Sequence, residues 1–307
     1  MARRVRDLLA ERAAESFVGR SDEMGILLQG LEEQGPLVLF VHGIAGVGKS
    51  SLLEAFLARA RGQGATVVRL DCRAIEPTER GVIHELGDAI GGNASAVEEV
   101  AERLGQLGER VVLALDTYEV FRLLDTWLRQ VFVPALGDNV RVVLSGREPP
   151  VAAWIASPEW QGLFRNVSLG PLSDGDALEL LLGADIGEER ARRINRFARG
   201  HPLALKLAAS AVAERPDLEL EDVAIPRVVE ELTRIYLHGV DDPLTRRTLD
   251  AASVIRRATQ SLLRAILPDL APQDAYERLR ALPFVESGRD GLILHDAVHD
   301  AIAAALR

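Results

Sequence analysis

A glycine-rich segment near the N-terminus restricts the fold of this chain more than any other part of its sequence. Residues 43–50 read Gly-Ile-Ala-Gly-Val-Gly-Lys-Ser and match the pattern G-x-x-x-x-G-K-S. The apolar residues 37–42 before this segment have the length of a strand. Residues 51–61 after it are strong helix formers, and that helix is expected to end at Gly62 and Gly64. A strand, a glycine loop and a helix in this order are typical of a phosphate-binding loop.

Each residue type in this loop has a physical role. The glycines let the backbone curl so that its N–H groups point at phosphate oxygens, and the following helix presents its positive N-terminus to the same anion. Lys49 can reach the β and γ phosphates, and the Ser50 hydroxyl can ligate Mg²⁺. An accidental match is disfavoured because Lys49 is one of only two lysines in the chain, the other being Lys206. The loop therefore predicts binding of ATP or ADP with Mg²⁺.

Composition and charge exclude several classes of protein. With 307 residues, 48% of them hydrophobic and 27% charged, the chain is expected to be globular with two or three domains. The single cysteine, Cys72, excludes an intrachain disulfide and is interpreted as a small residue at a strand end rather than a reactive thiol. No apolar stretch is long enough to span a bilayer, so we expect a cytoplasmic protein without a membrane partner. The net charge of −10 argues against non-specific binding to nucleic acid.

The first 170 residues alternate between apolar runs of strand length and helical patterns. Such alternation indicates an α/β fold, with a parallel sheet covered by helices on both faces. An amphipathic helix is predicted over residues 1–16, ahead of the sheet. The predicted strands are residues 37–42, 66–71, 111–115, 140–145 and 166–169, and the predicted helices are residues 51–61, 82–90 and 94–107.

The pattern changes to helices alone after residues 170 and 171. We predict helices over residues 174–182, 189–199, 203–214, 228–238, 244–255, 260–267 and 274–282, and a short hairpin formed by residues 283–286 and 292–294. Helices followed by a small hairpin suggest a winged helix. The expected organisation is an N-terminal helical extension (1–16), a P-loop nucleotide-binding domain (17–170), a helical domain (171–222) and a winged-helix domain (223–307).

Two acids and an arginine at strand ends are candidates for the chemistry. Asp116 closes the strand 111–115, at the edge where parallel sheets bind ligands, and can hold Mg²⁺; the alternative is a cap for the next helix. Glu119 is the candidate base that polarises water, because Thr117 stands where many ATPases of this type carry a second acid. Arg147 ends the strand 140–145 and is either a contact of the γ phosphate or a surface arginine on a loop.

With these pieces in order, the sequence resembles the STAND class of signal-transduction ATPases, which includes NB-ARC domains and MalT-type regulators. The resemblance covers residues 17 to about 300. Residues 17–20 (FVGR) resemble the hhGR motif, and residues 115–119 (LDTYE) resemble the Walker B segment. Residues 143–147 (VLSGR) are similar to the sensor arginine segment, residues 200–205 (GHPLAL) to the GxP motif and residues 294–296 (LHD) to the MHD motif.

The resemblance implies further site residues. The backbone and arginine of the first motif lie near the nucleotide, Pro202 packs near the adenine, and His295 reaches the β phosphate of ADP. The expected nucleotide-binding residues are Val18, Gly19, Arg20, Gly43, Ile44, Ala45, Gly46, Val47, Gly48, Lys49, Ser50, Ser51, Pro202 and His295. The expected catalytic residues are Lys49, Asp116, Glu119 and Arg147, and the expected metal ligands are Ser50 and Asp116.

The resemblance also implies a mechanism and partners. ADP would bridge the domains and hold them closed, and exchange for ATP would remove the His295 contact and open them, with a homo-oligomer as the expected ATP state. Hydrolysis would be slow and would reset the switch. Effector or sensor domains are expected as partners, either in the same chain or in separate chains.

Two other functions use the same loop. A DNA-binding initiator or regulator ATPase is supported by Arg256, Arg257 and Arg264 near the predicted helix 260–267, although the acidic total charge opposes it. A small-molecule kinase is disfavoured because no lid of clustered arginines is evident. Trp127, Trp154 and Trp160 are interpreted as packing residues rather than a binding box.

Overall fold

The structure is a computed structural model of the whole chain, and it describes residues 17–214, 242–280, 282, 285–288, 290–294, 299 and 302. These residues form two compact units. The first holds residues 17–44 and 48–170, and the second holds residues 45–47 and the described residues from 171 onward. The predicted helices over 1–16 and 228–238 and the candidate His295 lie outside the described residues.

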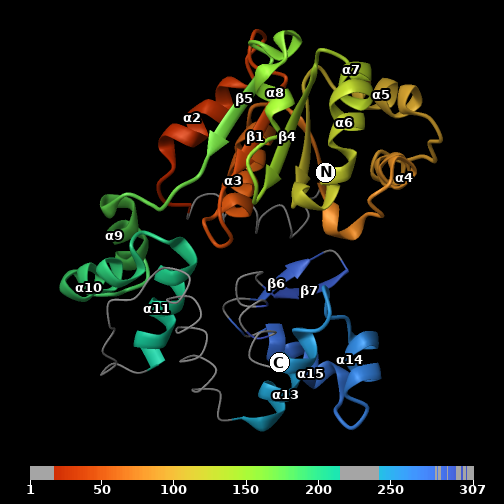
Figure 1. Cartoon of the computed structure of the whole chain (residues 1–307). Coiled ribbons are helices and arrows are strands. Elements are labelled where there is room, and N and C mark those ends of the chain that lie inside the picture. The colour runs from red at the N-terminus through yellow and green to blue at the C-terminus, as the bar shows by residue number, and fades with distance from the viewer. Residues whose placement is uncertain are drawn as a thin grey trace. The chain divides into compact units, whose positions relative to one another are not determined.

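A five-stranded parallel sheet forms the centre of the first unit (Figure 1). Its strand order is β2-β3-β4-β1-β5. The central strands β3 and β4 are buried along their whole length because both of their faces are covered, as expected for a parallel sheet. All five predicted strands are present, which confirms the α/β prediction. Their bounds are β1 Val38–His42, β2 Thr66–Asp71, β3 Val111–Asp116, β4 Val140–Gly146 and β5 Phe164–Ser168.

Helices cover both faces of this sheet (Figure 1). On one face lie α2 (Ser21–Gln29) and α3 (Lys49–Gly62), and on the other lie α4 (Glu79–Ala89), α5 (Val97–Gly105), α6 (Asp125–Trp127) and α7 (Val133–Ala135). Short helical segments complete the unit: η1 (Cys72–Ala74), η2 (Tyr118–Leu124), η3 (Leu128–Phe132), α8 (Ala152–Ala156) and η4 (Pro158–Trp160). Helix α4 begins earlier than predicted because the Thr78 hydroxyl accepts a hydrogen bond from Gly81 N and caps it.

The core under α4–α7 contains the predicted packing tryptophans. Trp154 is fully buried and stacks on Phe164, with ring centroids 5.3 Å apart, and its ring lies 4.7 Å from that of Trp160. Trp127 is half-buried and stacks on Phe132. The structure confirms the packing interpretation for all three tryptophans.

The second unit is helical with a small antiparallel hairpin. Its helices begin within two residues of the predicted positions: α9 Asp174–Leu182, α10 Glu188–Ala198, α11 Pro202–Glu214, α13 Pro243–Ala252, α14 Gln260–Ile266 and α15 Pro272–Arg280. The hairpin is β6 (Val285–Gly288) with β7 (Gly291–Leu294), and Ala258 adds a bridge to Leu292. Ser173 caps α9 as predicted, since its hydroxyl accepts from Asp176 N at 3.1 Å.

One cluster of buried apolar side chains runs through the second unit. It takes residues from α9–α11 and from α13–β7, including Leu181, Leu205, Leu249 and Leu292. The division of this part of the chain into a helical domain and a winged helix stays a prediction. Within the described ranges, none of the helices has the length and apolar character needed to cross a membrane.

Candidate functional site

The glycine loop leaves β1 and runs directly into α3. Gly46 and Gly48 have φ angles of 79° and 95°, a left-handed backbone that glycine adopts without the steric cost of a side chain. Gly48 is the N-cap of α3, so the N–H groups of the first helical turn, which have no acceptor within the helix itself, face the loop. This backbone has the shape and polarity of an anion cradle.

The side chain of Lys49 folds back over the loop. Its Nζ donates hydrogen bonds to the carbonyl oxygens of Gly43 at 2.8 Å and Ile44 at 3.0 Å. Ser50, the next residue, is half-buried, and Ser51 is exposed in the first turn of α3. The ammonium group therefore lies against the first two carbonyl oxygens of the loop.

Asp116 lies at the end of β3, and every oxygen of its carboxylate has a donor. Oδ1 accepts from the Ser50 hydroxyl at 3.4 Å and from Thr117 N at 3.0 Å, while Oδ2 accepts from Arg69 at 2.9 Å. A hydroxyl oxygen beside a carboxylate at the end of a phosphate loop is the kind of hard donor pair that Mg²⁺ prefers. Ser50 and Asp116 therefore fit the metal that their sequence positions predict.

Glu119 and Arg147 form an ion pair. Glu119 lies in η2, where its Oε2 accepts a hydrogen bond from Arg147 N and its Oε1 pairs with Arg147 Nε, both at 3.2 Å. Gly146 makes this approach feasible, because a Cβ there would lie 3.2 Å from the Glu119 carboxylate. Both oxygens of Glu119 are thus held by a single residue.

Strand register brings these groups to one edge of the sheet. Asp116 is opposite Ser145 of β4, and Gly146 is opposite His42 of β1, so the ends of three neighbouring strands are level. Asp116 is the last residue of β3. The segments that follow β1, β3 and β4 carry the other four predicted residues, Lys49, Ser50, Glu119 and Arg147. The structure therefore places the five predicted residues of the first unit around the carboxyl edge of the sheet.

Two polar residues at this edge were missed by the sequence reasoning. The Ser145 side chain is fully buried, and its hydroxyl has no hydrogen-bond partner among the described residues. His42 Nε2 is likewise unpaired within that part of the chain, and burial together with the charge of Lys49 lowers the pKa of His42. His42 is the last residue of β1 and Ser145 is the last but one of β4, and this position near a strand end is the signal that could have identified them.

The remaining predicted residues lie elsewhere in the two units. Arg20, which follows Val18 and Gly19, is buried with a φ of 60° at the start of α2; it pairs with Glu23 and donates to the carbonyl oxygen of Gly170. Pro202 is the first residue of α11.

The tip of the loop, residues 45–47, belongs to the second compact unit. Gly46 O accepts from Leu203 N at 3.2 Å, and Ala45 O lies 3.0 Å from Nε2 of His201. Val47 belongs to the same group and is buried. These contacts hold the backbone oxygens of Ala45 and Gly46 at the residues that flank Pro202.

A family model settles the class of the chain. The model described as Novel STAND NTPase 1 matches residues 8–192, more than half of the sequence. The chain belongs to this STAND NTPase family. It is therefore a P-loop NTPase, as the loop and the resemblance predict.

Solved structures of low identity share the fold of this STAND NTPase. A Walker-type ATPase of Pyrococcus abyssi is 19% identical, with 94% of this chain and 97% of that chain covered and a TM-score of 0.56. A STAND protein of Pyrococcus horikoshii with a tetratricopeptide repeat sensor is 17% identical with a TM-score of 0.62. That match covers 94% of this chain and 42% of the Pyrococcus horikoshii chain. Drosophila ORC bound to DNA is 14% identical, with 97% and 91% covered and a TM-score of 0.50. No curated protein sequence matches the STAND NTPase.

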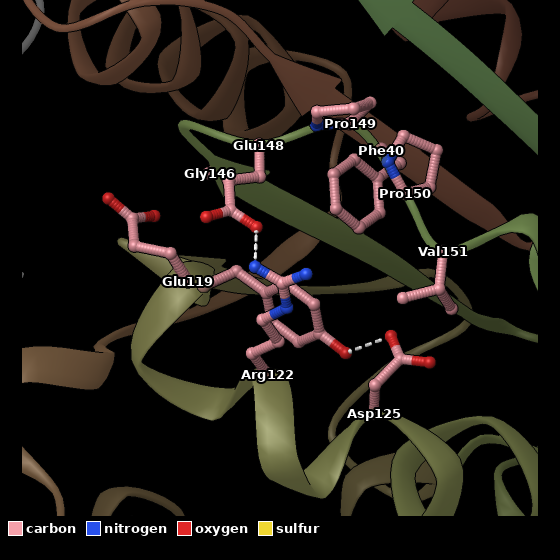
Figure 2. A pocket seen from close by; sticks show the side chains of 10 residues that line it. Phe40, Glu119, Arg122, Asp125, Gly146, Glu148, Pro149, Pro150 and Val151 are labelled. Carbon is pink, nitrogen blue, oxygen red and sulfur yellow. Dashed lines mark hydrogen bonds and ion pairs between the residues drawn. The ribbon is translucent and has the colours of Figure 1, made fainter.

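A pocket of about 290 Å³ adjoins Glu119 on the α4–α7 side of the sheet (Figure 2). Phe40 and Tyr118 contribute its aromatic walls, and the ion pair of Arg122 with Glu148 lies at its rim. Tyr118 donates to Asp125 at 2.8 Å, as does the Trp154 indole. Burial and the charge of Asp125 raise the pKa of Tyr118, so its hydroxyl is a permanent donor.

Cys72 follows β2 and is buried. Burial raises the pKa of its thiol, and the negative charges of Asp116, Asp71 and Glu119 raise it further. Burial and these charges favour the protonated thiol, and Cys72 directly follows β2, in line with its interpretation as a small residue at a strand end.

Proposed function

We propose that this STAND NTPase binds ATP and ADP with Mg²⁺ through residues 43–51 and acts as a signal-transduction switch with slow hydrolysis. Lys49 is proposed to bind the β and γ phosphates, and Ser50 and Asp116 are proposed to hold the metal. When bound, Mg²⁺ supplies positive charge that neutralises the phosphate oxygens. The supporting geometry is the cradle of left-handed glycines with Lys49 and Asp116 beside it.

The proposed switch rests on the hydrogen bond and the ion pair that Arg147 forms with Glu119. A general base needs a free carboxylate oxygen within reach of water, and both oxygens of Glu119 are engaged by Arg147. A γ phosphate is a strong competitor for a guanidinium, because charge-assisted bonds to phosphate are among the strongest that arginine forms. ATP would therefore draw the Arg147 side chain away and free Oε1 of Glu119, which the side chain holds, and ADP would not.

This difference between the nucleotides makes the pair a two-state element. A ligand shifts such an equilibrium only through its different contacts with the two states, and the γ phosphate supplies that difference here. Thr117 stands in place of a second acid, so Glu119 alone would polarise the water. Hydrolysis is accordingly proposed to be slow and to return Arg147 to Glu119.

The response of the rest of the chain is also part of the proposal. Pro202 is proposed to contact the adenine and His295 the β phosphate of ADP, with an ADP state that is closed and an ATP state that opens and forms oligomers. The C-terminal part is proposed to be a winged helix. A sensor or effector domain is the proposed partner, since the related Pyrococcus horikoshii protein carries a tetratricopeptide repeat sensor.

DNA binding by the C-terminal part is the alternative. It is favoured by Arg256 and Arg264, which are exposed near α14. It is opposed by the net charge of −10 and by Arg257, whose charge is paired with Asp290 at 3.0 Å. Titration of a fluorescently labelled DNA duplex separates the two functions, because non-specific DNA binding is strongest at low salt. Absence of binding at low salt would end this alternative.

The proposed function is tested by the nucleotide that copurifies with the protein. The wild type is expected to release ADP on heating, and Lys49→Ala is expected to release none, because the ammonium contact to the phosphates is lost. Lys206→Ala is the matched control, since Lys206 is the other lysine of the chain and lies exposed on α11. Failure of the wild type to bind ATP or ADP in calorimetry with Mg²⁺ would contradict the proposal.

A further inference from the structure

Arg69 occupies an unusual position for an arginine, inside a strand and directed at a buried acid. It lies on β2, opposite Ala114 of β3, and Asp116 is two residues further along β3 on the same face as Ala114. The methyl group of Ala114 leaves room for the long side chain to pass. Arg69 then donates to Asp116 Oδ2 at 2.9 Å, and its other terminal nitrogen lies 3.4 Å from Glu54 of α3.

The charge of Arg69 at this position is permanent, because a guanidinium stays protonated throughout the pH range in which proteins are folded. The carboxylate that Arg69 contacts is almost completely buried, with a side-chain exposure of 6%. An ion pair shielded from water in this way is stronger than a pair on the surface.

We propose that Arg69 is a positioning residue for Asp116, whose guanidinium supplies a fixed positive charge at this carboxylate and so sets how strongly nucleotide binding depends on Mg²⁺. The inference rests on the proposed function, because it takes Asp116 as the metal-binding carboxylate. It adds a residue that the loop and the Walker B segment do not contain.

Two electrostatic effects follow from this arrangement. Without Mg²⁺, an isolated carboxylate beside the loop would repel the phosphates of a nucleotide, and Arg69 reduces that repulsion. With Mg²⁺, Arg69 competes for the charge of the carboxylate that the metal uses. Arg69 therefore strengthens the binding of metal-free ADP and weakens the binding of Mg²⁺ to the ADP complex.

A structural role for the same ion pair predicts a different result. If Arg69 only stabilises the edge strand β2, its loss would weaken nucleotide binding by the same factor with and without Mg²⁺. The discriminating quantity is the ratio of the ADP dissociation constant in EDTA to that in saturating Mg²⁺. This ratio is a binding measurement and does not depend on turnover.

The test titrates a fluorescent ADP analogue into the full chain in both conditions. Arg69→Met is expected to raise the ratio on the order of tenfold. Arg69→Gln, which keeps polar contacts but removes the charge, is expected to raise it in the same direction if the methionine variant does not fold. Arg69→Lys keeps the charge and is expected to stay near the wild-type ratio.

Arg103→Met is the matched control. Arg103 has a side-chain exposure of 37%, close to the 35% of Arg69, and it also forms an ion pair, with Glu99 of α5. Its ratio is expected to equal that of the wild type. An unchanged ratio in the folded Arg69→Met or Arg69→Gln variant would overturn the inference while the proposed function stands. Absence of ADP binding by the wild type would overturn the proposed function, and this inference with it.

Discussion

The two acids at the carboxyl edge of the sheet are each held by an arginine, but in different ways. Asp116 ends a buried strand, has a side-chain exposure of 6%, and is fixed by Ser50, Thr117 and Arg69 from three directions. Glu119 lies on the short helix η2, has a side-chain exposure of 21%, and among the described residues is held by Arg147. The arginines are equally exposed, at 35% and 34%, so the difference lies in the acids.

This difference corresponds to two kinds of chemistry. A carboxylate with several fixed donors suits a metal ligand, which must keep one position in every state of the protein. A carboxylate that depends on one partner can be released when that partner finds a stronger anion. On this account Asp116 is the constant element of the site, and Glu119 is the element that responds to the γ phosphate.

The largest expected effect is a loss of ATP hydrolysis when Glu119, the proposed base, is replaced. Glu119→Gln is expected to lower ATP hydrolysis about 100- to 10,000-fold, the range usual for loss of a general base. Its affinity for ADP should remain within about twofold of the wild type, because Glu119 is not proposed to contact ADP. Phosphate release and ADP titration measure the two quantities. A variant that hydrolyses ATP at the wild-type rate would assign the base to another residue.

The next effect concerns the metal. Asp116→Asn is expected to reduce the gain in ADP affinity from Mg²⁺ about tenfold or more, since the charged ligand is lost. In EDTA the same variant should bind ADP more tightly than the wild type, because Arg69 keeps its charge and the repelling carboxylate is gone. Calorimetry with and without Mg²⁺ gives both values. Weaker binding in both conditions would mean that Asp116 supports the fold rather than the metal.

A smaller effect is expected at the arginine that holds Glu119. Arg147→Met should lower ATP affinity about tenfold relative to ADP affinity, because only ATP offers the γ phosphate to this side chain. Arg122→Met is the matched control, since Arg122 lies nearby and pairs with Glu148 at the pocket rim. Competition titrations with ADP and a non-hydrolysable ATP analogue measure the preference. An equal loss for both nucleotides would remove Arg147 from the sensor role.

The smallest effect is expected from loss of the hydrogen bond between Tyr118 and Asp125, a buried acid that supports the fold. Tyr118→Phe removes one of its hydrogen bonds and should lower the free energy of unfolding by about 1–3 kcal/mol. The dependence of ADP binding on Mg²⁺ should not change. Chemical denaturation checks the first expectation and the EDTA titration checks the second. A changed Mg²⁺ dependence would show that the pocket and the metal site are coupled.

Sequence patterns predicted the strands and helices whose burial or capping is visible in the local sequence. The strands β3 and β4 are mainly apolar and buried along their whole length, and their positions follow from burial on both faces. Asp116 and Glu119 could be identified because a strand end in this fold is where ligands bind. The start of helix α9 was predicted correctly because Ser173 is a strong N-cap.

The contacts between distant segments could not be predicted in this way. The pair of Arg69 with Asp116 depends on β2 lying next to β3, and strand order is a property of the whole sheet. The bond of the Trp154 indole to Asp125 joins residues 29 positions apart through the packing of α8 on the core. Local periodicity contains no information on either neighbour, whereas an arginine inside an apolar strand was a visible signal of a partner.

The central claim is that ATP, and not ADP, releases Glu119 from Arg147. Hydrogen exchange of the amides in residues 144–150 tests it most directly, because Arg147 N donates to Oε2 of Glu119 and this bond is expected to weaken once the Arg147 side chain no longer holds Oε1. The account predicts faster exchange of this segment with a non-hydrolysable ATP analogue than with ADP, at saturating concentrations of each. Equal exchange with both nucleotides, while both bind, would contradict it.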